Sequence, residues 1–180
     1  MNVANRLRAA LLALAVVPLT GATDLALVPV ASSPGSVFAG PVGRIVQSIT
    51  EYTTWPRREN PVTLCVVGPV SHADGLDGLR LADGRLIDRQ TVAATAFTPG
   101  VCDSLYIGRM SLPEMRALTA QARGRGVLTI AEADPDCRSQ AMFCLLFTPQ
   151  AATFRMNIDA IARSGLKVDP RVLRISQGGR

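Results

Sequence analysis

Four cysteines are the residues whose type points most directly to chemistry: Cys65, Cys102, Cys137 and Cys144. Four thiols can form two disulfides, or they can hold a zinc ion. Structural zinc sites favour a tight C-x2-C spacing, often with histidine as a further ligand. No cysteine pair here has that spacing, and His72 is the only histidine. The cysteines therefore predict two disulfides and no metal centre.

The pairing of the cysteines stays open at this point. Four cysteines allow three pairings, and spacing does not choose among them, although Cys137 and Cys144 are close enough to close a short loop. An even number of cysteines agrees with export to an oxidising compartment, where disulfides persist. The composition thus favours an exported protein.

Catalytic chemistry has little support. His72 stands between Ser71 and Asp74, but a catalytic triad is defined by groups that meet in space with separate roles, which sequence neighbours do not establish. The chain also lacks a Gly-x-Ser-x-Gly elbow, a phosphate-binding loop and a dinucleotide fingerprint. We therefore expect a protein that is not an enzyme and has no cofactor.

The first 22 residues have the pattern of a secretory signal peptide. Arg6 and Arg8 form a positive start, residues 9–17 are apolar but too few to span a bilayer, and Thr20-Gly21-Ala22 offers small residues for cleavage. The sequence predicts a cleaved signal peptide over residues 1–22. An uncleaved anchor is the alternative, because residues 25–30 are also apolar.

The composition is that of a folded domain that does not bind nucleic acid. Of the 180 residues, 48% are hydrophobic and 18% are charged. The formal net charge is +5, and it falls to +3 without the two arginines of the expected signal peptide, where no acid occurs. The remaining basic residues are scattered and lack an aromatic stacking platform.

Periodicity places the first elements. Residues 23–40 have no periodic pattern and predict a flexible leader. From Val42, apolar residues repeat at helical spacing as far as Tyr52, and Trp55-Pro56 ends the pattern, which predicts a helix over 41–54. The β-branched run over 62–67 predicts a buried strand that contains Cys65.

Further elements follow in alternation. Ser111 and Glu114 have capping-box spacing before a helix expected over 112–123. Other expected strands cover residues 85–92, 103–107, 127–131, 141–147 and 153–158, the last two as a hairpin; other expected helices cover 72–79, 158–163 and 170–175. The predicted fold is an α/β single-domain sandwich over 41–176, with a mixed β-sheet flanked by helices, stapled by two disulfides, and a tail at 177–180.

These landmarks resemble the YfiR/HmsC-like family over roughly residues 41–176. The resemblance rests on five segments: YTTWP at 52–56, VTLCVVG at 62–68, CDSLYI at 102–107, GVLTI at 126–130, and FRMNIDAIARSGLKVDPRVL at 154–173. The last is the most specific, because it combines an asparagine after a strand, a small helix and a Ser-Gly-Leu step.

The resemblance implies a location, a partner and a pairing. It implies a periplasmic protein that dimerises and represses an inner-membrane diguanylate cyclase by holding its periplasmic domain, which lowers cyclic-di-GMP and biofilm formation. It further implies disulfides Cys65–Cys102 and Cys137–Cys144, a repression that responds to redox state, and an outer-membrane lipoprotein as a second partner. One departure is Arg138-Ser139-Gln140-Ala141, where family members commonly have a Gly-Gly pair.

Partner-binding residues are expected among Trp55, Arg155, Asn157 and Leu166. A lone tryptophan can anchor a partner, although Trp55 at a helix end is more typical of the core. Asn157 more simply caps the turn that follows it. The Ser164-Gly165-Leu166 step is also expected to be structural.

Two functions from different classes remain. A regulator of a membrane protein predicts an exposed apolar patch with a polar rim. A periplasmic small-ligand binding module without a membrane partner predicts an enclosed pocket with convergent polar groups.

Overall fold

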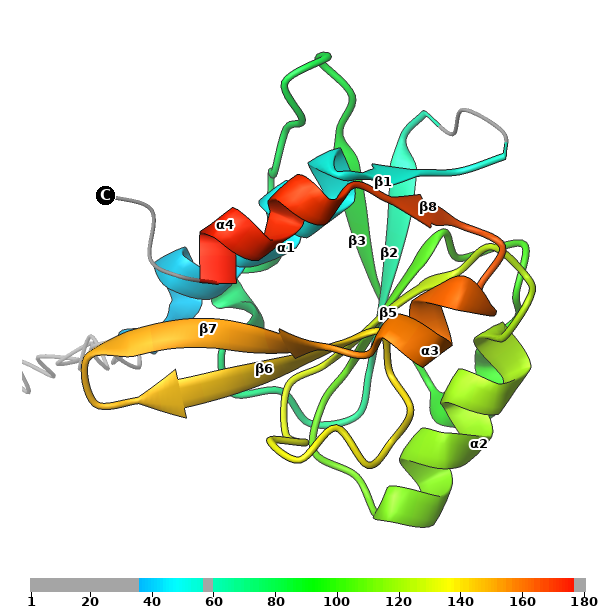
Figure 1. Ribbon diagram of the computed structural model, residues 1–180. Coiled ribbons are helices and arrows are strands. Elements are labelled where there is room, and N and C mark those ends of the chain that lie inside the picture. The colour runs from blue at the N-terminus through cyan, green and yellow to red at the C-terminus, as the bar shows by residue number, and fades with distance from the viewer. Residues whose placement is uncertain (1–35, 57–59, 177–180) are drawn as a thin grey trace, which may run out of the picture. The chain divides into compact units, whose positions relative to one another are not determined.

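A six-stranded mixed β-sheet organises the domain (Figure 1). The computed structural model describes residues 36–56 and 60–176. Strands β2 (Val62–Val67), β3 (Ile87–Val92), β4 (Ser104–Ile107), β5 (Leu128–Ala131) and β6 (Phe143–Thr148) are parallel, and β7 (Ala151–Met156) is antiparallel to β6. The order across the sheet is β3-β2-β4-β5-β6-β7.

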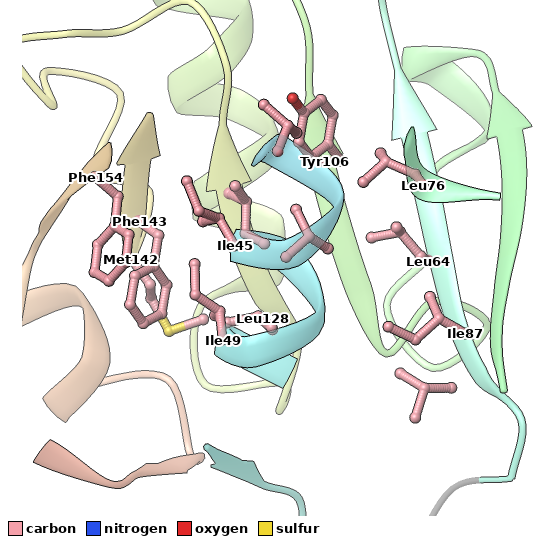
Figure 2. Close-up of a cluster of buried hydrophobic side chains, with 14 of the residues drawn as sticks. Ile45, Ile49, Leu64, Leu76, Ile87, Tyr106, Leu128, Met142, Phe143 and Phe154 are labelled. Carbon is pink, nitrogen blue, oxygen red and sulfur yellow. The ribbon is translucent and has the colours of Figure 1, made fainter. Parts of the chain in front are cut away.

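Helix α1 (Ala39–Glu51) covers one face of this sheet (Figure 1). Val42, Ile45, Val46 and Ile49 are all buried, as the helical spacing predicts. Figure 2 shows Ile45 and Ile49 over the sheet, among side chains from several strands: Leu64, Ile87, Tyr106, Leu128, Phe143 and Phe154. This cluster is the main core of the domain.

Helix α2 (Leu112–Ala122) packs on the opposite face. The capping box is present: Ser111 Oγ accepts from the Glu114 amide, and the Glu114 carboxylate accepts from the Ser111 amide at 2.9 Å. Side chains of successive β2 residues point to opposite faces of the sheet. Leu64 belongs to the cluster under α1, called the α1 core below, and Cys65 belongs to the cluster under α2, the α2 core. The expected sandwich with a mixed sheet flanked by helices is confirmed.

The C-terminal part returns across the α1 side. After β7 the chain forms α3 (Ile158–Ala162), β8 (Lys167–Val168), the 3-10 helix η3 (Pro170–Val172) and α4 (Leu173–Ser176). Strand β8 pairs antiparallel with β1 (Thr53–Thr54). This small sheet was not predicted. The helix predicted over 41–54 ends at Glu51, because Thr53 and Thr54 pair with β8.

The remaining differences are small. The helix predicted over 72–79 is the 3-10 helix η1 (Ala73–Leu76), and η2 (Ala94–Ala96) was not predicted. Helix α1 begins at Ala39, inside the segment expected to be leader. The predicted signal peptide, residues 23–35 of the leader and the tail at 177–180 lie outside the described residues.

Candidate functional site

Two disulfides hold the domain at different points. Cys65 of β2 is bonded to Cys102, just before β4, with 5.7 Å between their Cα atoms. Cys137 is bonded to Cys144 of β6, with a Cα separation of 5.5 Å. The pairing implied by the family resemblance is therefore the pairing in the structure, and none of the four cysteines is free.

The order of the parallel strands reverses between β2 and β4, at whose carboxyl ends a sheet of this type would bind a ligand. The five parallel strands follow the order 2-1-3-4-5 when they are numbered among themselves, and doubly wound sheets bind ligands where the strand order reverses. Here that point is filled by the protein. Gly68 packs under the Met110 side chain, and a Cβ on Gly108 would overlap the Pro69 carbonyl oxygen.

Glu132, which follows β5, completes this closure. Glu132 is buried, with only 5% of the residue exposed. One carboxylate oxygen accepts from the Ser71 amide at 2.6 Å, and the other accepts from the Tyr106 hydroxyl at 2.9 Å. Burial raises the pKa of Tyr106 well above its ordinary value, and the neighbouring negative charge of Glu132 raises this pKa further. The arrangement closes the place where a ligand would enter.

An aromatic cluster lies next to this closed edge. The rings of Phe38, His72 and Phe147 are in mutual contact, with centroids 4.3 to 5.4 Å apart, and all three side chains are partly exposed. Ser36 Oγ is hydrogen-bonded to His72 Nδ1. The cluster joins three distant parts of the chain, so no local sequence pattern could have predicted it. Because His72 contacts two aromatic rings and is hydrogen-bonded to Ser36, it has a packing role in the described structure.

Three of the four expected partner-binding residues also have structural roles. Trp55 is buried, and its Nε1 donates to the Asp103 carbonyl at 3.2 Å. Asn157 Oδ1 caps α3 by accepting from the Ala160 amide at 3.0 Å. Leu166 is 7% exposed and belongs to the α1 core. The structural roles considered for Trp55 and Asn157 are confirmed.

Arg155 differs from the other three. It lies on β7, its side chain is exposed, and it forms no ion pair with any other described residue. The structure does not bring the four expected residues together as one exposed surface. The role of all four in partner binding stays a prediction. Arg155 fits it most directly, because its side chain is exposed.

Two hollows are relevant to small-ligand binding. A hollow of about 20 Å³ between α2 and α3 has room for a single water. A larger hollow of about 350 Å³ lies beside β3, and its charged lining is Asp77, Asp88 and Arg89. The Arg89 guanidinium is already paired with Asp77 at 2.8 Å. Neither hollow is a deep pocket with several unengaged polar groups turned inward.

The described part of the chain has neither a membrane-spanning helix nor a cluster of metal-ligating side chains. Within residues 36–56 and 60–176, no helix is both long and apolar enough to cross a bilayer. The same residues contain no group of three His, Cys, Asp or Glu side chains suited to a metal ion.

Comparison with known families decides the relationship. A family model described as YfiR/HmsC-like matches residues 42–177, which includes all the strands of the six-stranded sheet. The chain belongs to the YfiR/HmsC-like family. The match includes both disulfides and the C-terminal segment 154–173. It therefore covers the described domain from Val42 onward.

The segment at 138–141, where the resemblance led us to expect a Gly-Gly pair, includes an unusual backbone conformation. Gln140 has φ +66°, in the left-handed region that favours glycine, and Cys137 has φ +56°. The loop before β6 therefore has a backbone conformation suited to glycine at two positions that are not glycine.

Proposed function

We propose that this protein is a periplasmic negative regulator that binds the periplasmic domain of an inner-membrane diguanylate cyclase and represses cyclic-di-GMP synthesis. The observation that carries the proposal is membership of the YfiR/HmsC-like family across residues 42–177. The proposal includes export by a cleaved signal peptide, a homodimeric state and release of repression by an outer-membrane lipoprotein.

Three observations support this function. All four cysteines are paired, which suits an oxidising compartment such as the periplasm. The strand-order reversal, where a doubly wound sheet would take a ligand, is closed by Glu132 and its two hydrogen bonds. His72 is engaged by Ser36 and two rings, an environment that suits packing more than proton transfer.

The mechanism is stoichiometric and involves no catalytic step. A bound protein shifts a conformational equilibrium only through its different affinities for the two states. Repression therefore requires tighter binding to the inactive cyclase conformation. A shift from 99% active to 99% inactive requires about a 10⁴-fold difference in affinity.

Redox control is part of the proposal. Cys65 and Cys102 tie β2 to the segment before β4, so reduction would release two neighbouring central strands from their covalent link. Cys137 and Cys144 constrain the loop before β6. We propose that loss of either constraint weakens repression by loosening the domain.

A pull-down from detergent-solubilised membranes tests this function. Tagged mature protein is incubated with the membranes, with and without a thiol reductant, and the retained proteins are identified by mass spectrometry. We expect a diguanylate cyclase to be retained, and to be retained less after reduction. Retention of no membrane protein would contradict the proposal and favour the small-ligand alternative.

A further inference from the structure

The two edges of the six-stranded sheet differ in how they are protected. At the β3 edge, the Ile87 amide donates to the Leu79 carbonyl at 2.9 Å, and Leu86 forms an antiparallel bridge with Arg80. Arg89 of β3 is ion-paired with Asp77 at 2.8 Å. Cover by a neighbouring segment and charged side chains are common ways to prevent unwanted strand pairing.

The β7 edge has no such protection among the described residues. Its six residues pair with β6 in one unbroken register, so no bulge turns the edge away. The Asn157 amide donates to the Met142 carbonyl at 2.8 Å, which fixes the alternation of the ladder. By this alternation, the N–H and C=O groups of Ala152, Phe154 and Met156 point away from β6.

The helices near β7 pack on its face. Phe154 of β7 and Ile175 of α4 both belong to the core cluster beneath α1, which places these side chains on the sheet face. No backbone hydrogen bond joins the outward groups of Ala152, Phe154 or Met156 to another described residue. Among residues 36–56 and 60–176, these groups thus have the arrangement to which an added strand pairs.

Charge indicates what kind of strand would fit. Residues 151–176 contain five basic and two acidic side chains, a net charge of +3. The other described residues contain nine basic and ten acidic side chains, a net charge of −1. The excess positive charge of the described domain thus lies in β7 and the segment that follows it.

The two acids in this segment are already paired. Asp159 is ion-paired with Arg163, and Asp169 with Arg171. The cations that form no ion pair with a described residue are Arg155, Lys167 and Arg174. Arg155 lies on β7 itself and is the only charged residue of that strand. An acidic partner would therefore be attracted to this edge.

One apolar side chain adds a further contact at the end of the edge. Ile158 begins α3, two residues after β7, and 64% of it is exposed. A strand that adds to β7 and extends past Met156 would reach this side chain. In strand addition, main-chain hydrogen bonds supply the affinity and side-chain contacts supply specificity, so Ile158 would favour a strand with an apolar residue at that end.

We propose that β7 is the docking edge for an extended, acidic strand of the cyclase's periplasmic domain, which adds to the sheet beside Ala152–Met156. This inference rests on the proposed function and names the surface that performs it. A second copy of this chain is a poorer occupant, because pairing β7 with β7 would bring two +3 segments together.

Ala152→Pro tests the backbone part of the proposal. The Ala152 amide points away from β6, so proline removes an outward donor and blocks strand addition without removing a β6–β7 hydrogen bond. Arg155→Glu tests the charge part. We expect each variant to bind the partner domain at least roughly tenfold more weakly, which corresponds to the loss of one net hydrogen bond or charge contact.

Matched control variants are available elsewhere in the domain. By the parallel ladder with β2, in which the Val62 amide donates to the Leu86 carbonyl, the Thr91 amide points away from the sheet at the opposite edge. Thr91→Pro is therefore the backbone control. Arg109→Glu is the charge control, because Arg109 is exposed and lies in the loop after β4. Circular dichroism and the thermal midpoint show that each variant is folded.

The experiment uses the full mature chain and the purified periplasmic domain of a diguanylate cyclase whose output the wild-type chain lowers in cells. Dissociation constants are measured by calorimetry, and oligomeric state by light scattering. Weaker binding of the β7 variants, with both controls unchanged, is the expected result. Equal binding by Ala152→Pro and wild type would overturn the β7 inference while leaving the proposed function intact.

Two other outcomes would also overturn the inference. If the β7 variants change only the oligomeric state of the protein, the edge belongs to a second copy of this chain. If the wild-type chain lowers the output of no diguanylate cyclase and binds no such domain, the proposed function and the β7 inference fail together.

Discussion

Glu132 and Tyr106 form the polar contact on which the closed end of the sheet depends. Both side chains are buried, and the Glu132 carboxylate accepts one bond from Tyr106 and one from the Ser71 amide. A buried carboxylate that loses a donor keeps its desolvation cost without compensation. Tyr106 is therefore a structural residue whose hydroxyl has a measurable contribution to stability.

Tyr106→Phe should lower the free energy of unfolding by about 2 kcal/mol at neutral pH, because one hydrogen bond to a charged group is lost. It should also change the response to alkaline pH. The pKa of Tyr106 is raised above 10.0, so its stabilising effect is complete below pH 10 and falls as pH rises above it. Wild type should lose up to roughly 1.4 kcal/mol per pH unit there, and the variant should lack this component.

Urea titrations between pH 8 and pH 11 measure this effect. Tyr52→Phe is the control, since Tyr52 is the only other tyrosine and is partly exposed. Identical alkaline slopes for wild type and Tyr106→Phe would show that Tyr106 does not stay protonated in the folded state.

Gln140 has a backbone conformation that a side chain disfavours. Its φ of +66° lies in the left-handed region, where a Cβ approaches the following carbonyl oxygen. Gln140→Gly should therefore raise the free energy of unfolding by roughly 0.5 to 1 kcal/mol. Gln121→Gly, at the exposed next-to-last residue of α2, should lower it by up to about 1 kcal/mol. Denaturant midpoints that move in the same direction for both variants would contradict the role of φ.

Local chemistry explains which residue roles could be predicted. The cap at Asn157 and the capping box at Ser111 depend on neighbours three residues away, so the sequence indicates them directly. The contacts of Glu132 span 26 and 61 residues, and no short pattern predicts them.

At the scale of elements, the two disulfides constrain segments of very different length. Cys65 and Cys102 are 37 residues apart, whereas Cys137 and Cys144 are 7 residues apart. In the chain-entropy description, a longer closed loop restricts the unfolded chain more strongly. The first bridge should therefore contribute more to stability.

Paired alanine substitutions test this expectation. Cys65→Ala with Cys102→Ala should cost about 4 kcal/mol, and Cys137→Ala with Cys144→Ala about 2.5 kcal/mol. Chemical unfolding of both double variants at neutral pH gives the comparison. If Cys65→Ala with Cys102→Ala has the stability and the repression of wild type, the structural role proposed for the Cys65–Cys102 bridge is contradicted.

The predictability of the elements followed the strength of their patterns. The β-branched run at Val62–Val67 and the capped helix α2 were predicted almost to the residue. The pairing of β1 with β8 was missed, because two-residue strands are too short to show periodicity and their partners are distant in the chain. The same pairing explains why α1 ends before Thr53.

At the scale of the whole molecule, charge and edge protection are both asymmetric. The β3 edge is covered at its start and carries a charged pair. The β7 edge pairs with no further described strand and is followed by the segment that holds the excess positive charge of the described domain. The α/β sandwich could be predicted because the order of strands and helices indicates it. The edge position of β7 could not, because sheet order depends on contacts between distant strands.

Cellular cyclic-di-GMP is the measurement that tests the central claim most directly. The protein is expressed with and without residues 1–22 in cells that contain the cyclase recovered by pull-down, and the nucleotide is quantified by mass spectrometry. We expect the exported form to lower cyclic-di-GMP and the form without residues 1–22 to leave it unchanged, because only the former reaches the cyclase's periplasmic domain. Equal cyclic-di-GMP levels in cells with and without the exported protein would contradict the account.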